Sequence, residues 1–242
     1  MWEGVSGKAK VEGGTVTGGG EKVRDFLDYE LVRKRRGSIG VLGRLRARLK
    51  KATVSLPGGC AIGTRPVDLH LKGFEALGAE IQLEEGYIHA IAPNGLKGAH
   101  VLFPSVSVGA TENVRMAASL ADGTTTIANA AREPEIADLA HCLQTMGAEI
   151  DGIDTDTLTV VGKPSLHGGD HQVIPDRIET ATYAAASAIP GRYITLKNTR
   201  LDLINAVADV LIKAGAEVSE TEDGIRVTRT NGRIKGVDVM TE

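Results

Sequence analysis

The sequence predicts an α/β (α+β) fold built from a repeated βα unit. The tripeptide Gly-Ala-Glu occurs three times, with its glycines at Gly78, Gly147 and Gly215, at intervals of 69 and 68 residues. A period of this length indicates one structural unit used three times. In each copy a helical pattern ends at the glycine, which adopts the left-handed conformation of a helix C-cap without Cβ strain. Short strands are predicted to follow each glycine.

The third copy gives the fullest picture of the unit. Leu203, Val207 and Leu211 recur at helical spacing, and Asp223-Gly224 is a dipeptide that favours a tight hairpin. The predicted elements of this copy are helix 178–189, strand 193–196, helix 201–214, and strands 217–219 and 225–228. A further strand is predicted around Val237 and Val239.

The first two copies follow the same order. The second copy is predicted to contain helices 111–121 and 134–146 and strands 124–127, 157–161 and 171–174. In the first copy, a loop joins strand 52–56 to helix 66–77. A helix is also plausible over residues 29–49, although three glycines weaken it. Residues 1–20 are glycine-rich without periodicity, and we expect a poorly ordered or weakly folded segment there.

Composition narrows the class of protein. A chain of 242 residues with 42% hydrophobic residues can bury a substantial core. No apolar run is long enough for a membrane span, and the N-terminus lacks the apolar core of a secretory signal, so we expect a cytoplasmic protein. Cys60 and Cys142 are far apart in the sequence and predict no disulfide framework.

Charge is distributed unevenly along the chain. Residues 1–51 hold thirteen of the 28 Lys and Arg residues but only six of the 31 Asp and Glu residues. The run Arg33 to Arg36 suggests a nucleic-acid surface, but no base-stacking aromatic residues accompany it. A charged helix face that partly serves anionic substrates is the favoured interpretation, and neither nucleic acid nor membrane is an expected partner.

Reactive residue types gather in the loop of the first copy. Pro57-Gly58-Gly59 ends the preceding strand and requires irregular backbone, and Cys60 follows directly. Arg65 lies five residues later, and Pro66 suits the first position of a helix. An adjacent guanidinium or helix N-terminus lowers a thiol pKa from its usual value of about 8.5. Cys60 is therefore a candidate nucleophile or proton donor, whereas the alternative is an inert buried cysteine.

Other motifs are weaker. Ser107, Val108 and Gly109 precede a predicted helix, whose free N–H groups and dipole suit an anionic diphosphate, although many helices begin in this way. His167 and His171 are four residues apart without a third ligand, so we expect no metal site. The segment around Asp154 and Asp156 lacks the glycine and glutamate of a calcium loop and is expected to be a turn.

The residues around Cys60 also carry a resemblance. The run VSLPGGCAIGTRPVDLHLKG resembles the active-site loop of the UDP-N-acetylglucosamine 1-carboxyvinyltransferases. Four further runs resemble the same family in the same order: YELVRK from Tyr29, VSVGAT from Val106, ADGTTTIANAAREPEIADLA from Ala121, and IPDRIETATY from Ile174. The resemblance extends from about Tyr29 to Glu242, and residues 1–28 show none.

The resemblance implies an architecture. Members of the family have two domains, each made of three βα units arranged as an inside-out α/β barrel, with the active site between the domains. On this template, residues 29–174 resemble two units of the domain that bears the cysteine loop. Residues 175–242 resemble the first unit of the second domain, and residues 1–28 form an unmatched segment. The chain therefore resembles a family member truncated at both ends.

The resemblance also implies a reaction. The family transfers the enolpyruvyl group of phosphoenolpyruvate to the 3-hydroxyl of UDP-N-acetylglucosamine and releases phosphate, without a metal or organic cofactor. Cys60 matches the cysteine that protonates the enolpyruvate methylene and reacts with fosfomycin. The positions that match substrate-binding residues are Arg36, Arg65, Pro66, Val67, Asp68, Leu69, Ser105, Val106, Ser107, Val108 and Gly109. Ser105 stands where a lysine is common.

Several family features have no counterpart here. Residues 1–28 contain no equivalent of a lysine-asparagine motif that binds phosphoenolpyruvate, and the chain stops before an aspartate proposed to handle the 3-hydroxyl proton and before a second phosphoenolpyruvate-binding arginine. A non-catalytic nucleotide-sugar-binding fragment or assembly module is therefore the alternative to an enzyme. The related shikimate-pathway transferase is disfavoured because its signature lacks this cysteine loop.

Overall fold

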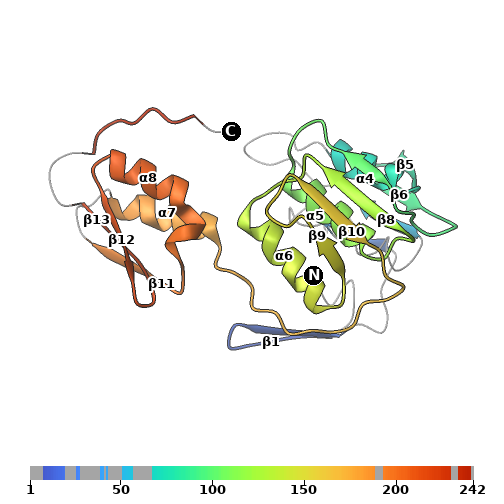
Figure 1. The fold of residues 1–242 in the computed structure, drawn as a ribbon, viewed down its shortest axis with the longest axis horizontal. Coiled ribbons are helices and arrows are strands. Elements are labelled where there is room, and N and C mark those ends of the chain that lie inside the picture. The colour runs from blue at the N-terminus through green and yellow to red at the C-terminus, as the bar shows by residue number, and fades with distance from the viewer. Residues whose placement is uncertain are drawn as a thin grey trace. The chain divides into compact units, whose positions relative to one another are not determined.

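The protein is described from a computed structural model, which covers residues 8–19, 26–27, 39–40, 42, 51–56, 67–188, 193–229 and 234–240. The chain divides into two compact units, residues 1–171 and 172–242, which Figure 1 shows with mixed helices and strands in each. The predicted α/β class is confirmed, because every Gly-Ala-Glu segment joins a helix to a β-hairpin. The structure divides the chain after residue 171, and the domain boundary expected from the resemblance lies three residues later, after residue 174.

The three helix ends have the geometry that the repeated glycine predicts. Gly78, Gly147 and Gly215 have φ angles of 87°, 96° and 102°. In each case the glycine N–H and the next alanine N–H donate hydrogen bonds to carbonyls of the last helical turn. The three alanines are all buried, so the chain turns inward at the same point of each unit. These matching ends confirm that one local sequence encodes one local structure three times.

The described part of the first unit contains two four-stranded sheets with helices α4, α5 and α6. The first sheet has strand order β3–β4–β6–β5, and the second has the order β7–β8–β10–β9. The strands are β3 (Phe26–Leu27), β4 (Lys51–Ser55), β5 (Glu80–Glu84), β6 (Tyr87–Ile91), β7 (His100–Leu102), β8 (Thr124–Ala128), β9 (Glu149–Asp151) and β10 (Thr157–Val161). The helices are α4 (Asp68–Ala76), α5 (Val108–Ala118) and α6 (Pro134–Thr145). A separate hairpin pairs β1 (Lys8–Glu12) with β2 (Thr15–Gly19).

One continuous core joins the first two copies of the repeat. This core contains Phe74 and Leu77 from the first copy and Phe103, Val114 and Ile127 from the second. None of these side chains is more than 2% exposed. Helices α4 and α5 pack directly against each other. Gly73 lies in this contact, where an added Cβ would overlap Cγ2 of Val114. The two helices therefore approach as closely as they do because residue 73 has no side chain.

Replacing Gly73 with alanine is expected to destabilise the protein by roughly 1–2 kcal/mol. Alanine improves helix propensity by about 1 kcal/mol, but overpacking a closely packed core costs about 1–3 kcal/mol, and the β-branched Val114 has few alternative rotamers. Urea unfolding followed by circular dichroism gives the difference. The double variant Gly73→Ala/Val114→Ala should show a favourable coupling, since removing the valine methyls makes room for the new Cβ. Additive effects of the two changes would refute this packing account.

The second unit is a single copy of the repeat. Its sheet has the order β11–β13–β12, and helices α7 and α8 contact each other and the strands (Figure 1). The elements are α7 (Arg177–Ala188), β11 (Ile194–Lys197), the 3-10 turn η2 (Leu201–Ile204), α8 (Asn205–Lys213), β12 (Glu217–Thr221) and β13 (Gly224–Thr228). Asp176 caps α7, since its Oδ1 accepts hydrogen bonds from the N–H groups of Ile178 and Glu179 at 2.8 and 3.1 Å.

Some predicted elements differ from the structure. Helix α5 begins at Val108, three residues before the predicted start, because Ser107 provides the N-cap. The strand predicted at 171–174 is absent, and this segment is an extended connection between the two units. The strand predicted around Val237 and Val239 is also absent from the described residues 234–240. Most of the helix predicted over 29–49 lies outside the described residues. The hairpin β1–β2 lies in a segment for which we predicted no regular structure.

Candidate functional site

The predicted site residues fall into two groups. Arg36, Cys60, Arg65 and Pro66 lie outside the described residues. The described members begin two neighbouring helices: Val67, Asp68 and Leu69 at the start of α4, and Ser105, Val106, Ser107, Val108 and Gly109 at the start of α5. The structure thus brings together two segments about forty residues apart in sequence.

The start of α5 is an open helix N-terminus. Ser107 is the N-cap, and its Oγ accepts a hydrogen bond from the Ala110 N–H at 3.3 Å. The preceding Val106 is 56% exposed. Helix geometry leaves the N–H groups of Val108 and Gly109 without intrahelical acceptors. These donors and the positive end of the helix dipole suit an anionic oxygen, as the sequence predicts.

A buried polar contact holds the starts of α4 and α5 together. His70 on α4 is 7% exposed, and its Nδ1 lies 2.7 Å from Nδ2 of Asn113 on α5. The same Asn113 Nδ2 donates a hydrogen bond to the Ile39 carbonyl at 2.8 Å, which fixes the orientation of the amide. A Cβ added to Gly109 would lie 3.1 Å from Cε1 of His70, so the imidazole rests against the first turn of α5.

Electrostatics keep His70 neutral. Burial lowers the pKa of His70 from 6.5 to about 4, and the carboxylate of Asp68 partly opposes this shift. Because Asn113 Nδ2 is a donor, Nδ1 of His70 accepts and the proton of the neutral ring lies on Nε2. Sequence analysis did not identify His70 or Asn113, because neither stands out by spacing. The one available signal was the position of His70 immediately after the candidate residues Val67 to Leu69.

A second buried polar group lies further along α5. Arg115 is completely buried, and its Nη1 donates a hydrogen bond to the Ile136 carbonyl at 2.5 Å. Within the part of the chain that the structure describes, its Nε and Nη2 have no hydrogen-bond partner, and neither has the buried Oε2 of Glu133. Burial lowers the pKa of Arg115 to about 10, and Glu112 opposes the shift. Burial of a guanidinium with two unpaired nitrogens among the described residues disfavours the folded state.

The weaker sequence motifs have structural roles. His171 Nε2 lies 2.9 Å from Asp138 Oδ1 and anchors the connection to α6, whereas His167 Nδ1 is 2.7 Å from the Gly168 carbonyl. Thr155 makes a turn by donating to the Gly152 carbonyl. In the described parts of the chain, no three His, Cys, Asp or Glu side chains are grouped as metal ligands. Within those same parts, no helix has the length and apolar character needed to cross a membrane.

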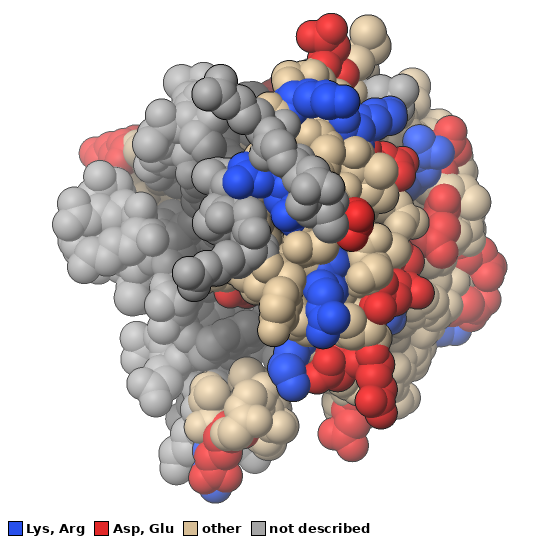
Figure 2. Space-filling view, turned by 90° about the vertical axis from the view of Figure 1, so that its left-hand side faces the viewer, with Lys and Arg blue, Asp and Glu red and all other residues tan. Residues whose placement is uncertain are grey.

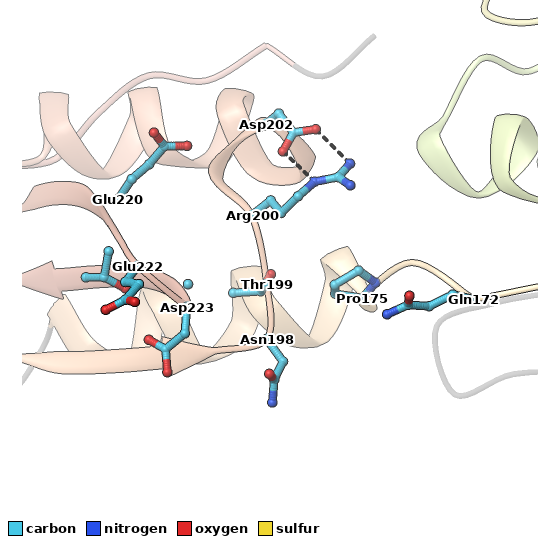
Figure 3. Close-up of a pocket in the computed structure, with 11 residues that line it drawn as sticks. Gln172, Pro175, Asn198, Thr199, Arg200, Asp202, Glu220, Glu222 and Asp223 are labelled. Atoms are coloured by element: carbon cyan, nitrogen blue, oxygen red, sulfur yellow. Dashed lines mark hydrogen bonds and ion pairs between the residues drawn. The ribbon is translucent and has the colours of Figure 1, made fainter. Parts of the chain in front are cut away.

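The second unit contains a pocket of about 530 Å³. Figure 3 shows Arg200 and Asp202 pointing toward each other at its rim, with hydrogen bonds of 3.0 and 2.9 Å. This contact lowers the pKa of Asp202. The lining also includes Glu220, Glu222 and Asp223, and Arg200 is its single cation among the described residues. Because that cation is already paired, the pocket in this unit is poorly suited to a phosphate-bearing substrate.

Surface charge does not form a continuous basic face on the side of the molecule that Figure 2 shows. Lys and Arg side chains of the described residues are interspersed there with Asp and Glu. The basic run Arg33 to Arg36, which raised the nucleic-acid interpretation, lies outside the described residues. The described part of this face therefore offers no basic stripe of the kind that follows a phosphate backbone.

Comparison with solved structures defines the class of fold. The enolpyruvyl transferase NikO from Streptomyces tendae superposes with a TM-score of 0.74 and 21% identity, covering 91% of this chain and 54% of NikO. EPSP synthase from Acinetobacter baumannii superposes with a TM-score of 0.62 and 20% identity, covering 84% of this chain and 48% of that protein. At these identities the likeness establishes the enolpyruvyl transferase fold and nothing finer.

Sequence comparison then gives the family. The profile of the EPSP synthase (3-phosphoshikimate 1-carboxyvinyltransferase) family matches residues 7–242, and the chain belongs to this family. The match begins inside the segment 1–28, where the sequence alone showed no resemblance. Relatives named UDP-N-acetylglucosamine 1-carboxyvinyltransferase include those of Granulibacter bethesdensis, 58% identical over 93% of this chain, and Dinoroseobacter shibae, 60% identical over 89%. The chain covers 53% and 51% of these two relatives, about half of their length.

These relatives confirm the resemblance that the motifs indicated. The family profile is described by the shikimate-pathway reaction, but the relatives at 56–60% identity carry the nucleotide-sugar name. The described site residues that begin α4 and α5 lie within the matched range.

Proposed function

We propose that this chain carries the catalytic cysteine and the nucleotide-sugar segments of an enolpyruvyl transferase that acts on phosphoenolpyruvate and UDP-N-acetylglucosamine. The observation that carries the proposal is 56–60% identity, over about nine tenths of the chain, to relatives named for this reaction. The reaction is the first committed step of peptidoglycan precursor synthesis, on which cell shape and division depend. A cytoplasmic location follows from the proposed substrates.

The proposed chemistry is an addition followed by an elimination. The 3-hydroxyl of the sugar adds to C2 of phosphoenolpyruvate and releases its proton to solvent, while the Cys60 thiol delivers a proton to the C3 methylene and becomes a thiolate. The thiolate then takes a proton from C3, which expels inorganic phosphate and restores the double bond as an enol ether. Arg65 suits the phosphate or carboxylate of phosphoenolpyruvate, because its guanidinium is planar and permanently charged. No metal or organic cofactor takes part in this scheme.

The described helix starts would hold the nucleotide sugar. The N–H groups of Val108 and Gly109 have no intrahelical acceptors at the start of α5 and suit the diphosphate. Val67 and Leu69 are half-buried and pack against the core, whereas Asp68 is exposed at the first position of α4. The His70–Asn113 contact sets the spacing of the two helix starts. Arg36, Pro66 and Ser105 complete the proposed substrate-binding set.

The decisive test compares the two cysteines. Phosphate release from phosphoenolpyruvate should require UDP-N-acetylglucosamine, and Cys60→Ala should lower the rate by about 10²-fold or more, as loss of a proton-transfer group does. Cys142→Ala is the matched control, since Cys142 lies on α6, and its rate should stay close to that of the unaltered protein. Intact mass and peptide mapping after fosfomycin treatment should place a single adduct on Cys60. An adduct on Cys142, or phosphate release that survives Cys60→Ala, would contradict the proposal.

A non-catalytic nucleotide-sugar-binding module is the second candidate. The helix starts proposed to hold the nucleotide sugar lie at the beginnings of α4 and α5 among the described residues, and binding there does not require turnover. Isothermal titration separates the two candidates. Saturable binding of UDP-N-acetylglucosamine without any phosphate release would support the module, and turnover that depends on Cys60 would support the enzyme.

A further inference from the structure

Two loops follow neighbouring parallel strands of the second sheet. Strands β7 and β8 pair in parallel, and Leu102 at the end of β7 lies opposite Ala128 at the end of β8. Residues 103–107 lead from β7 to the start of α5, and residues 129–133 lead from β8 to the start of α6. Because the strands are parallel, both loops begin at the same edge of the sheet. The loop 129–133 is therefore a neighbour of the α5 start.

Hydrogen bonds hold the loop 129–133 against the start of α5. Asn129 has a φ angle of 56°, and its Nδ2 donates to the Phe103 carbonyl at 2.9 Å. The Ala131 N–H donates to Oγ1 of Thr111 at 3.1 Å, and this hydroxyl donates to the Ser107 carbonyl at 2.8 Å. Thr111 is completely buried, so water does not compete for these bonds. One hydroxyl oxygen thus links the backbone of Ala131 to the N-cap residue of α5.

A buried side chain with an unused donor lies at the same helix start. His70 is 7% exposed and uses Nδ1 to accept from Asn113, so its proton is on Nε2. Among the described residues, Nε2 of His70 has no hydrogen-bond partner, and it lies 3.4 Å from the position of a Cβ added to Gly109. The N–H groups of Val108 and Gly109 also lack intrahelical acceptors. Three donors without a described acceptor indicate a site for an anion.

The helix starts themselves provide no positive side chain for this anion. Residues 67–71 and 105–112 contain two carboxylates and no lysine or arginine. The neighbouring loop contains Arg132, whose side chain is exposed and forms no ion pair or hydrogen bond with any described residue. The adjacent Glu133 does not neutralise it, because Oε2 of Glu133 is buried and has no partner among the described residues. Arg132 is thus an unpaired guanidinium on a loop that is fixed beside the α5 start.

We infer that Arg132 is a further substrate-binding residue, whose guanidinium binds the diphosphate at the start of α5; this inference rests on the proposed function. The planar and permanently charged fork of an arginine suits phosphate oxygens. Because the hydrogen bonds of Asn129 and Thr111 hold the backbone of the loop beside the N-cap, the Arg132 side chain extends from a fixed point near the free donors. Asn129 and Thr111 are accordingly positioning residues for this guanidinium.

Isothermal titration of the full chain with UDP-N-acetylglucosamine tests this role. Arg132→Met should weaken binding by about tenfold or more, since charge-assisted hydrogen bonds to the diphosphate are lost. Arg132→Lys keeps the charge and should lose less. Lys163→Met is the matched control, because it removes one cation at the opposite end of α5, where the Lys163 N–H donates to the Ser119 carbonyl. Its affinity should equal that of the original chain.

Salt dependence separates a direct charge contact from an indirect effect on the fold. Added sodium chloride should weaken binding to the original chain more steeply than binding to Arg132→Met, because salt screens the contact that the variant lacks. If the original chain binds the nucleotide sugar while Arg132→Met binds it with the same affinity, or with the same salt slope, the inference about Arg132 is overturned and the proposed function stands. If the original chain does not bind the nucleotide sugar, the proposed function is refuted and this inference with it.

A double-mutant cycle tests how the loop positions the guanidinium. Asn129→Gly keeps a residue that tolerates the positive φ angle but removes the hydrogen bond to the Phe103 carbonyl. In the original chain this change should weaken binding of UDP-N-acetylglucosamine several-fold. In the Arg132→Met background it should have little further effect, because no guanidinium is left to position. Equal losses in the two backgrounds would refute Asn129 as a positioning residue for Arg132.

Discussion

Replacing Arg115 with methionine is expected to stabilise the protein by about 1–3 kcal/mol. Arg115 is completely buried on α5, and among the described residues only its Nη1 has a hydrogen-bond partner, the Ile136 carbonyl. The Nε and Nη2 groups are desolvated without a described hydrogen-bond partner, and burial lowers the pKa of Arg115 more than the carboxylate of Glu112 raises it. Methionine fills similar space in a helix without a charge, and its flexibility suits an irregular cavity. The lost hydrogen bond is smaller than the desolvation cost that is removed.

Guanidinium denaturation of the full chain, followed by circular dichroism, measures this gain. Arg132→Met is the matched control, because Arg132 is exposed and the same substitution there should change the free energy of unfolding by less than about 0.5 kcal/mol. Arg115→Ala should be less stable than Arg115→Met by about 2–5 kcal/mol, since truncation leaves a cavity. A methionine variant less stable than the original chain would mean that the guanidinium has stabilising contacts that outweigh its burial.

The repeat was predictable from sequence because its signals are local. A glycine at 78, 147 and 215 must take a positive φ to end a helix, and this requirement depends on neighbouring residues alone. The hairpin at Asp223-Gly224 was found for the same reason. The strand predicted at 171–174 was wrong because an apolar pair at Val173 and Ile174 also suits an extended connection, and none of the described strands pairs with it.

Around the start of α5, sequence reasoning identified some of the site residues and missed others. Ser107 and Gly109 were identified because Ser-Val-Gly before a helical pattern is a local signal, although the helix was predicted from Thr111 and begins at Val108. The link from His70 through Asn113 to Ile39 was not, since it joins residues up to 74 apart in sequence, and only packing of α4 against α5 brings them together. Sequence analysis also missed Arg115, because the side chain of an arginine in a helix is normally expected to be exposed to solvent.

His70 should make the stability of the protein depend on pH between about 6.5 and 4. In the folded chain its pKa is lowered to about 4, whereas the unfolded chain binds a proton at about 6.5. Below pH 6.5 the unfolded state therefore takes up a proton that the folded state excludes. The contribution is fully present above pH 6.5 and is lost as the pH falls to about 4, with a total of up to about 3 kcal/mol.

The pH slope distinguishes His70 from the other titrating groups. Urea unfolding of the original chain and of His70→Asn should be compared at steps from pH 7 to pH 4. Asparagine retains an acceptor for Asn113 but does not titrate in this range, so the difference in free energy of unfolding between the two proteins should shrink or reverse as the pH falls. His100→Asn is the matched control, since His100 is exposed on β7 and its replacement should leave the slope unchanged. Parallel pH profiles for His70→Asn and the original chain would mean that the imidazole is hydrated in the folded state, and the fixed spacing of the two helix starts would then need another cause.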